Sequence, residues 1–201
     1  MTTLWLVRHG ETDWNVAGRL QGQLEVPLNE NGRRQAKLLA VRLRREAPFA
    51  ALFTSDLGRA RETAEEVSKV LGLASTVREA LRERHFGLLS DLTLEEIAER
   101  HPELSARLRA RDPHFVPAGG ESLSQTYERS CRALGAIARE WPGARVIVVT
   151  HGGVIDAAWR AAMGFPLQVK RELELSNASI NKVRVTEGRF ELELFGDVAH
   201  L

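Results

Sequence analysis

The feature that most constrains the fold is a short apolar run that recurs along the chain, each time followed by a segment with helical periodicity. Three runs are predicted to be buried strands: residues 3–7 (TLWLV), 50–54 (AALFT) and 145–150 (RVIVVT). Three amphipathic helices are predicted to follow them: 29–46, 56–71 and 154–163. Such alternation is typical of parallel βαβ units. We therefore predict an α/β fold, a three-layer sandwich whose mostly parallel central sheet has helices on both faces.

The rest of the chain adds elements to this sheet. Residues 182–185 and 190–195 flank TEGR and predict an antiparallel hairpin at the sheet edge. Residues 83–120 have a weaker pattern and predict a short helical insertion over the site, not a separate domain. Two capping boxes are expected before helices, Thr93 with Glu96 and Ser122 with Gln125. With no internal repeat, residues 1–201 are predicted to form one domain.

Composition excludes several classes of protein. The 201 residues carry a net charge of +1, which argues against general nucleic-acid binding. No apolar run is long enough to span a membrane, and the first residues do not resemble a signal peptide, so a cytoplasmic protein is expected. Cys131 is the single cysteine and falls on an apolar stripe, so an inert thiol is expected. The histidines lack metal-ligand spacing, so we expect no metal and no cofactor.

Polar side chains of one chemical type follow the predicted strands. Arg8 and His9 follow the first, Arg59 falls in the first turn after the second, and His151 follows the third. Parallel strands bring their carboxyl ends to one edge of the sheet, where ligands of open α/β sheets bind. Arginines, histidines and helix N-termini there would form a pocket for a dianion, and the natural dianion is a phosphoryl group.

A histidine in such a pocket can also act as a nucleophile. Neutral imidazole can attack phosphorus in line and form a phosphohistidine, which water then hydrolyses. An isolated histidine near a strand end is more often structural, but His9 in R-H-G-E-T, with His151 at a second strand end, favours catalysis. The departing alkoxide needs an acid within reach, and Glu83 is the best candidate, with Glu79 as the nearby alternative.

These residues stand in a recognisable set of motifs. In chain order, "LVRHGETDWN", "GRLQG", "PLNENGRRQA", "TSDLGRARETA", "LRERHFG", "GGESL" and "VVTHGGV" resemble the histidine phosphatase superfamily over nearly the whole chain. The resemblance implies that His9 becomes phosphorylated and that Glu83 donates a proton and then activates water. It implies phosphoryl or substrate contacts from Arg8, Asn15, Gln21, Gly22, Arg59, His151 and Gly152.

Within the family, two features favour hydrolysis over phosphoryl return. The mutases carry a longer insertion that supplies basic residues for the carboxylate of phosphoglycerate, whereas the segment between Gly87 and Gly119 is short. Mutases also commonly have asparagine at the position of Gly153. One departure concerns Ser90 and Asp91, where many of the phosphatases have an acidic residue and a glycine, so the wall of the pocket there is open to question.

We therefore predict a metal-independent phosphatase that hydrolyses a small phosphorylated metabolite through a phosphohistidine on His9. The first alternative is a cofactor-dependent phosphoglycerate mutase, which would need 2,3-bisphosphoglycerate to charge His9. The second is a non-catalytic module that binds phosphorylated ligands. The sequence leaves open the physiological ester, the pathway and the oligomeric state, and no nucleic acid or membrane is expected as a partner.

Overall fold

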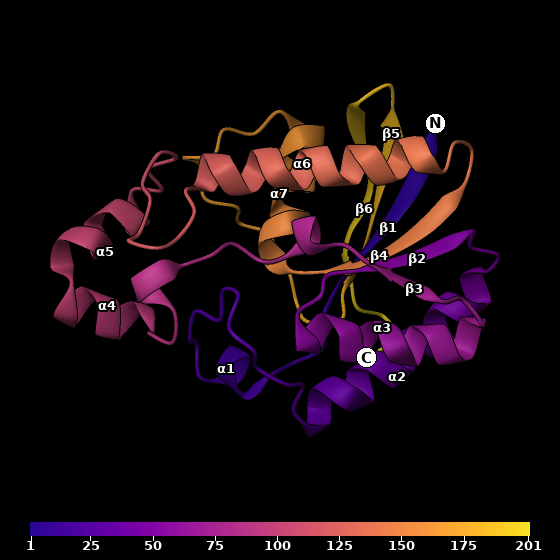
Figure 1. Ribbon diagram of the computed structural model, residues 1–201, viewed down its shortest axis with the longest axis horizontal. Coiled ribbons are helices and arrows are strands. Elements are labelled where there is room, and N and C mark those ends of the chain that lie inside the picture. The colour runs from indigo at the N-terminus through magenta and orange to yellow at the C-terminus, as the bar shows by residue number, and fades with distance from the viewer.

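The computed structural model describes residues 1–201 and is built on one six-stranded sheet, with the strand order β3-β2-β4-β1-β5-β6 (Figure 1). The strands are β1 (Thr2–Arg8), β2 (Ala51–Thr54), β3 (Ser75–Val77), β4 (Arg145–Thr150), β5 (Ile180–Thr186) and β6 (Arg189–Asp197). The first four are parallel, and β5 and β6 add an antiparallel hairpin at the edge, beside β1. The predicted α/β class and the hairpin are confirmed.

Helices cover both faces of the sheet. They are α1 (Asp13–Val16), α2 (Glu30–Glu46), α3 (Gly58–Leu71), α4 (Leu94–Arg100), α5 (Pro102–Arg109), α6 (Leu123–Glu140) and α7 (Gly152–Met163), with short 3-10 turns at Glu79–Leu81 and Gly87–Leu89. Helices α6 and α7 lie on one face, and α2 and α3 lie on the other (Figure 1). The three predicted layers are therefore present.

The alternation of side chains along β1 explains why both faces are covered. Leu4 and Leu6 pack in the core shared with α6 and α7, whereas Trp5 and Val7 pack in the core shared with α2 and α3. Successive side chains of a strand point to opposite faces, so a continuous apolar run needs cover on both sides. The apolar run at residues 3–7 is thus the signature of a central strand.

The predicted insertion is confirmed as the helix pair α4 and α5. It lies to one side of the sheet, beyond the carboxyl ends of the parallel strands (Figure 1). It has a small core of its own, in which Leu89, Ile97 and Phe115 are buried. The expected capping boxes are present: Thr93 with Glu96 begins α4, and Ser122 with Gln125 begins α6.

Two helix starts differ from the prediction. Helix α3 begins at Gly58, later than expected, because Ser55 Oγ accepts the Leu57 N–H and holds the preceding residues in a turn. Helix α7 begins at Gly152, earlier than expected, directly after His151. The glycine pair therefore belongs to the first turn of α7, where backbone N–H groups have no partner within the helix.

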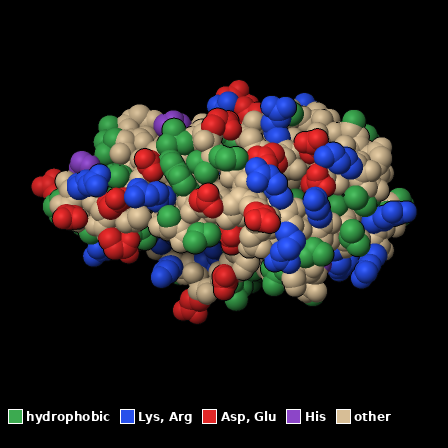
Figure 2. Space-filling view, turned by 90° about the horizontal axis from the view of Figure 1, so that it is seen from below, with side chains coloured by type: hydrophobic (Ala, Val, Ile, Leu, Met, Phe, Trp, Pro, Cys, Tyr) green, Lys and Arg blue, Asp and Glu red, His purple; other side chains and the backbone are tan.

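Acidic and basic side chains are interspersed on the face that carries α2 and α3 (Figure 2). Ion pairs such as Lys69 with Glu65 and Arg33 with Glu62 lie on these helices. This face shows none of the broad basic surface that nucleic-acid binding requires. No helix combines the length and the apolar character needed to cross a bilayer.

Candidate active site

Two histidines and an arginine meet at the carboxyl ends of β1, β2 and β4. The imidazole centroids of His9 and His151 are 5.2 Å apart, and both side chains are buried. His151 Nε2 is 2.9 Å from Ser55 Oγ, whereas His151 Nδ1 has no partner. Arg59, from the first turn of α3, is also buried and is close enough to lower the pKa of both imidazoles. The structure therefore brings together the strand-end residues that the sequence predicted.

The hydrogen bond of His9 defines its tautomer. His9 Nδ1 is 2.7 Å from the carbonyl oxygen of Gly10, which can only accept, so Nδ1 carries the proton. Burial holds the pKa of His9 well below its usual value, and the charges of Arg59 and Arg8 lower it further. The imidazole is therefore neutral near pH 7, with an unprotonated Nε2 that has no partner in the protein.

Arg59 is held in place by the loop that precedes α2. Its two Nη atoms donate to the carbonyl oxygens of Gly22, at 2.7 Å, and Leu24, at 3.0 Å. Gly22 has φ of +53°, a conformation that glycine adopts without strain. Burial lowers the pKa of Arg59 to about 10, so the guanidinium stays charged at neutral pH. Its Nε is buried without a partner.

Arg8 supplies the second cation. Its Nη1 donates to the carbonyl oxygen of Leu175 at 2.5 Å, while Nε is buried without a partner. Burial lowers the pKa of Arg8, and the carboxylate of Glu83 opposes this shift. Unsatisfied donors on Arg8 and Arg59 beside two neutral imidazoles are what a site for an anionic oxygen group requires.

Glu83 is positioned by the glycine turn of α7. The Gly153 N–H lies 3.1 Å from Oε1 and 3.0 Å from Oε2 of Glu83, and the Arg84 N–H donates to Oε1 at 2.7 Å. A Cβ on Gly153 would lie only 2.1 Å from Oε1, so the carboxylate can occupy this place only beside glycine. The alternative acid, Glu79, is 74% exposed and pairs with Arg82. Of the two candidate acids, Glu83 is therefore the one that lies at this site.

Asn15 presents its amide nitrogen without a protein partner. Its Oδ1 accepts from the Thr12 N–H at 3.1 Å, from Thr12 Oγ1 at 3.0 Å and from Asn177 Nδ2 at 3.1 Å. The Asn177 amide also donates to the carbonyl oxygens of His9 and Gly10. Because Oδ1 is occupied, Asn15 Nδ2 is the group left free to donate.

Sequence reasoning missed Asn177, although a signal for it existed. Asn177 precedes β5, which pairs antiparallel with β1. The start of an antiparallel neighbour lies beside the carboxyl end of β1, so residues just before β5 necessarily approach His9.

The segment around Glu83 has two further supports that the sequence did not reveal. The Gln23 side-chain amide donates to the carbonyl oxygen of Glu83 at 3.0 Å. Arg129, on α6, donates to the same oxygen at 3.3 Å while it pairs with both carboxylate oxygens of Glu121. The predicted Gln21 is buried, and its Oε1 has no hydrogen-bond partner.

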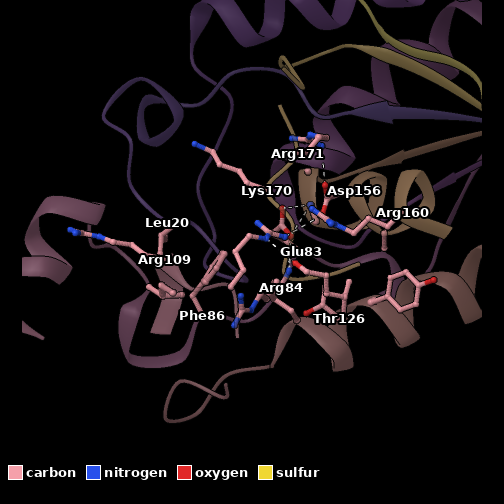
Figure 3. Close-up of a pocket in the computed structure, with 18 of the residues that line it drawn as sticks. Leu20, Glu83, Arg84, Phe86, Arg109, Thr126, Asp156, Arg160, Lys170 and Arg171 are labelled. Carbon is pink, nitrogen blue, oxygen red and sulfur yellow. Dashed lines mark hydrogen bonds and ion pairs between the residues drawn. The ribbon is translucent and has the colours of Figure 1, made fainter. Parts of the chain in front are cut away.

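A cavity of about 460 Å³ opens beside Glu83 and the first turn of α7 (Figure 3). Gly152 lines it, together with Gly153. Neither Ser90 nor Asp91 does, so the departure noted in the sequence does not alter this wall. Asp91 has φ of +66°, the conformation that a glycine there would favour.

The structure brings no three His, Cys, Asp or Glu side chains into an arrangement that could hold a metal ion. The single thiol, Cys131, is in its neutral form near pH 7, because burial raises its pKa to about 11. His85 Nδ1 accepts from the Gly87 N–H and faces a second, shallower hollow. These side chains take no part in the site.

Comparison with known proteins identifies the family of this chain. The family model for the histidine phosphatase superfamily (branch 1) matches residues 4–198. A metal-independent phosphoserine phosphatase from Arabidopsis thaliana is 42% identical over 203 residues, covering 100% of this chain and 84% of that protein. The phosphoglycerate mutase-like protein 4 of the same plant is 38% identical, covering 98% of this chain and 85% of that protein.

Among solved structures, Bacillus stearothermophilus YhfR superposes with a TM-score of 0.91 at 36% identity, covering 100% of this chain and 99% of that one. The fold prediction is confirmed by this likeness. The predicted enzyme class, a phosphatase, agrees with the family model and with the first relative above. The chain belongs to the histidine phosphatase superfamily.

Proposed function

We propose that this protein is a metal-independent phosphatase that hydrolyses small phosphomonoesters through a phosphohistidine on His9. The observation that carries the proposal is the bond from His9 Nδ1 to the Gly10 carbonyl oxygen, which leaves a neutral, unprotonated Nε2 among buried cations. Such a nitrogen can attack phosphorus, and the surrounding donors can stabilise the transferring group. We also propose that residues 1–201 act as one domain.

In the first step, the lone pair of His9 Nε2 attacks phosphorus and the bond to the ester oxygen breaks. Glu83, entering as the carboxylic acid, gives its proton to the departing alkoxide. Arg8, Arg59 and Asn15 Nδ2 donate to the phosphoryl oxygens, and His151 donates from Nδ1, since the Ser55 hydroxyl satisfies its Nε2.

In the second step, Glu83, now a carboxylate, takes a proton from water. The resulting oxygen attacks phosphorus, the bond to Nε2 breaks and phosphate leaves. Gly152 and the Gln21–Gly22 turn border the group and contribute positioning contacts, as the family resemblance implies.

The second candidate is a phosphoglycerate mutase, favoured by the names of several relatives, one of them mutase-like and others probable phosphoglycerate mutases. It differs in the fate of the phosphoryl group, which would return to the bound glycerate. The close contact between Gly153 and Glu83 favours hydrolysis, because it leaves no room for the asparagine that the mutases commonly have at this position.

The test is phosphate release from a panel of phosphomonoesters in the presence of EDTA, with trapping of an acid-labile, base-stable phosphoprotein. His9→Ala should abolish both turnover and the adduct, with a loss of at least about 10³-fold. His114→Ala, which removes an exposed imidazole, is the matched control and should behave as wild type.

Isomerised phosphoglycerate without net phosphate release would establish the mutase instead. Phosphate binding with neither adduct nor turnover across the panel would overturn both enzymatic candidates and leave a binding module.

A further inference from the structure

The cavity beside Glu83 is where the leaving group of a substrate must lie. Its walls come from the insertion, from α6 and α7, and from the segment after α7 (Figure 3). Figure 3 shows Glu83 near the middle of this group, with Leu20, Phe86 and Arg109 to one side and Arg160 to the other. A volume of about 460 Å³ is within the range of small-molecule sites. Which of these lining residues a substrate contacts therefore depends on its leaving group.

The charged residues of this cavity are strongly biased toward cations. The basic side chains that line it are Arg84, Arg109, Arg111, Arg160, Lys170 and Arg171, against two acidic ones, Glu83 and Asp156. The whole chain carries a net charge of only +1, so this excess is local. A cavity with such a field favours an anionic ligand.

Asp156 is shared by three arginines and cannot neutralise them all. It lies 2.7 Å from Arg160 Nε, 3.3 Å from Arg171 Nη1 and 3.9 Å from Arg111 Nη2, and Figure 3 shows it between Arg160 and Arg171. Arg160 Nη2 and Arg171 Nη1 are buried without a hydrogen-bond partner. Two positive charges are left over around one carboxylate.

The arginines differ in what they can offer a ligand. Arg160 is fully buried, and its remaining contact is with the Pro166 carbonyl oxygen, so it acts as a fixed support for Asp156. Arg111 and Arg171 keep 26% and 20% of their side-chain surface exposed, which leaves them accessible from the cavity. Burial lowers the pKa of both, as does the neighbouring charge of Arg160. An additional anion would relieve this repulsion.

We propose that Arg111 and Arg171 form an anion subsite, so that the preferred substrate is a phosphomonoester whose leaving group carries a second anionic group, a carboxylate or a second phosphate. The proposal rests on the proposed function for the position of the reacting phosphoryl group. It differs from the pattern of the mutases, since the cations come from the end of a short insertion and from the segment after α7.

The test measures binding, which does not depend on turnover. Calorimetric titration of the His9→Ala protein compares 3-phosphoglycerate with glycerol 3-phosphate, which lacks the carboxylate, and fructose 1,6-bisphosphate with fructose 6-phosphate, which lacks the second phosphate. In at least one pair, we expect the member with the second anionic group to bind at least about tenfold more tightly than its partner. The pair with the larger preference identifies the carboxylate or the phosphate as the recognised group.

Variants then locate the preference. Arg171→Gln and Arg111→Gln, each made in the His9→Ala protein, should remove most of this preference while changing the affinity for the ester without the second anionic group about twofold or less. Asp156→Asn should increase this preference, because Arg111 and Arg171 lose the carboxylate that partly neutralises them. Arg184→Gln removes the same charge from the far hairpin and should leave the preference unchanged.

The proposal is overturned if neither pair shows a preference, if neither ester binds, or if the preference survives both Arg111→Gln and Arg171→Gln. The wild-type turnover assay separates this failure from that of the proposed function. Hydrolysis at equal rates of esters with and without an anionic leaving group would overturn the subsite alone, whereas the absence of any phosphohistidine or phosphate release would overturn the phosphatase.

Discussion

The proposed phosphoryl pocket around His9 and the proposed leaving-group cavity beside Glu83 are adjacent but are built in different ways. The pocket is made at strand ends, where His9, His151 and Arg59 are almost fully buried. Backbone carbonyl groups hold His9 and Arg59, and the Ser55 hydroxyl holds His151. The cavity is made largely by the insertion and by the segment after α7, and its cations Arg111 and Arg171 are partly exposed. The residues proposed to act on the phosphoryl group thus lie at the rigid edge of the sheet. The residues proposed to select the substrate lie in segments that can vary without disturbing the sheet.

The largest effect that tests this contrast is expected from Gly153→Ala, at the border of the two regions. The added Cβ would lie 2.1 Å from Glu83 Oε1, so the carboxylate must move. We expect kcat/KM to fall about 10²-fold for every ester, because small displacements of a catalytic group are costly. Stability should change little, since the displaced atom is the end of a flexible side chain.

The matched control for that variant is Gly135→Ala on α6, where the nearest atom to the new Cβ is 3.5 Å away. It should retain full activity in steady-state assays and gain a little stability from helix propensity. Full activity of Gly153→Ala would mean that the position of Glu83 does not limit the reaction.

A smaller effect is expected from Asn177→Ala, which removes the amide that holds the Asn15 side chain and the carbonyl oxygens of His9 and Gly10. Loss of the 3.1 Å hydrogen bond to Asn15 Oδ1 should lower kcat/KM about tenfold. The decrease should be equal for esters with and without an anionic leaving group. Arg171→Gln should instead discriminate between them, so the two variants separate positioning in the pocket from selection in the cavity. Asn31→Ala on α2 is the control. A selective effect of Asn177→Ala would contradict this division.

The two regions should also differ in how pH affects stability. Burial and Arg59 hold the pKa values of His9 and His151 below the usual 6.5, whereas the cavity arginines do not titrate near neutrality. Below pH 6.5 the unfolded chain binds protons that the native histidines do not, so the free energy of unfolding must fall as the pH decreases.

Urea denaturation between pH 7 and about pH 5.5 measures this slope, which should be shallower in the His9→Asn/His151→Asn protein than in wild type. Arg111→Gln should leave the slope unchanged. An identical slope in the double variant would mean that the two histidines are protonated in the native state.

The smallest effect concerns the insertion alone. Asp91 has φ of +66°, and its carboxylate makes only a 3.5 Å ion pair with Arg19 while 58% exposed. Asp91→Gly should therefore raise the free energy of unfolding by about 0.5–1 kcal/mol without changing activity. Asp91→Ala, which keeps the strained φ, should show no such gain. A destabilised Asp91→Gly would show that the ion pair outweighs the backbone.

Much of the fold could be predicted because its signals are local. The apolar run ending at Val7 indicates a central strand from its period and composition alone, and the capping box of Thr93 and Glu96 marks the start of α4 within four residues. His9, Arg59 and His151 could be brought together on paper because parallel strands share one carboxyl edge. The roles of these residues remain predictions until they are tested.

What the sequence could not decide depends on residues distant along the chain. Asn177 reaches His9 because β5 pairs antiparallel with β1, and Arg129 holds Glu83 across from α6. Likewise, Arg111 reaches Asp156 only because the insertion folds against α7, and Arg171 joins it from the segment after α7, whereas the pair with Arg160 is local to the helix. By itself, the sequence determined the strand-end chemistry, since that follows from short-range pattern and strand direction. Tertiary structure alone decided which residues support the site residues and how the charges of the cavity are arranged, because contacts between segments far apart in the chain leave no periodic signal in either one.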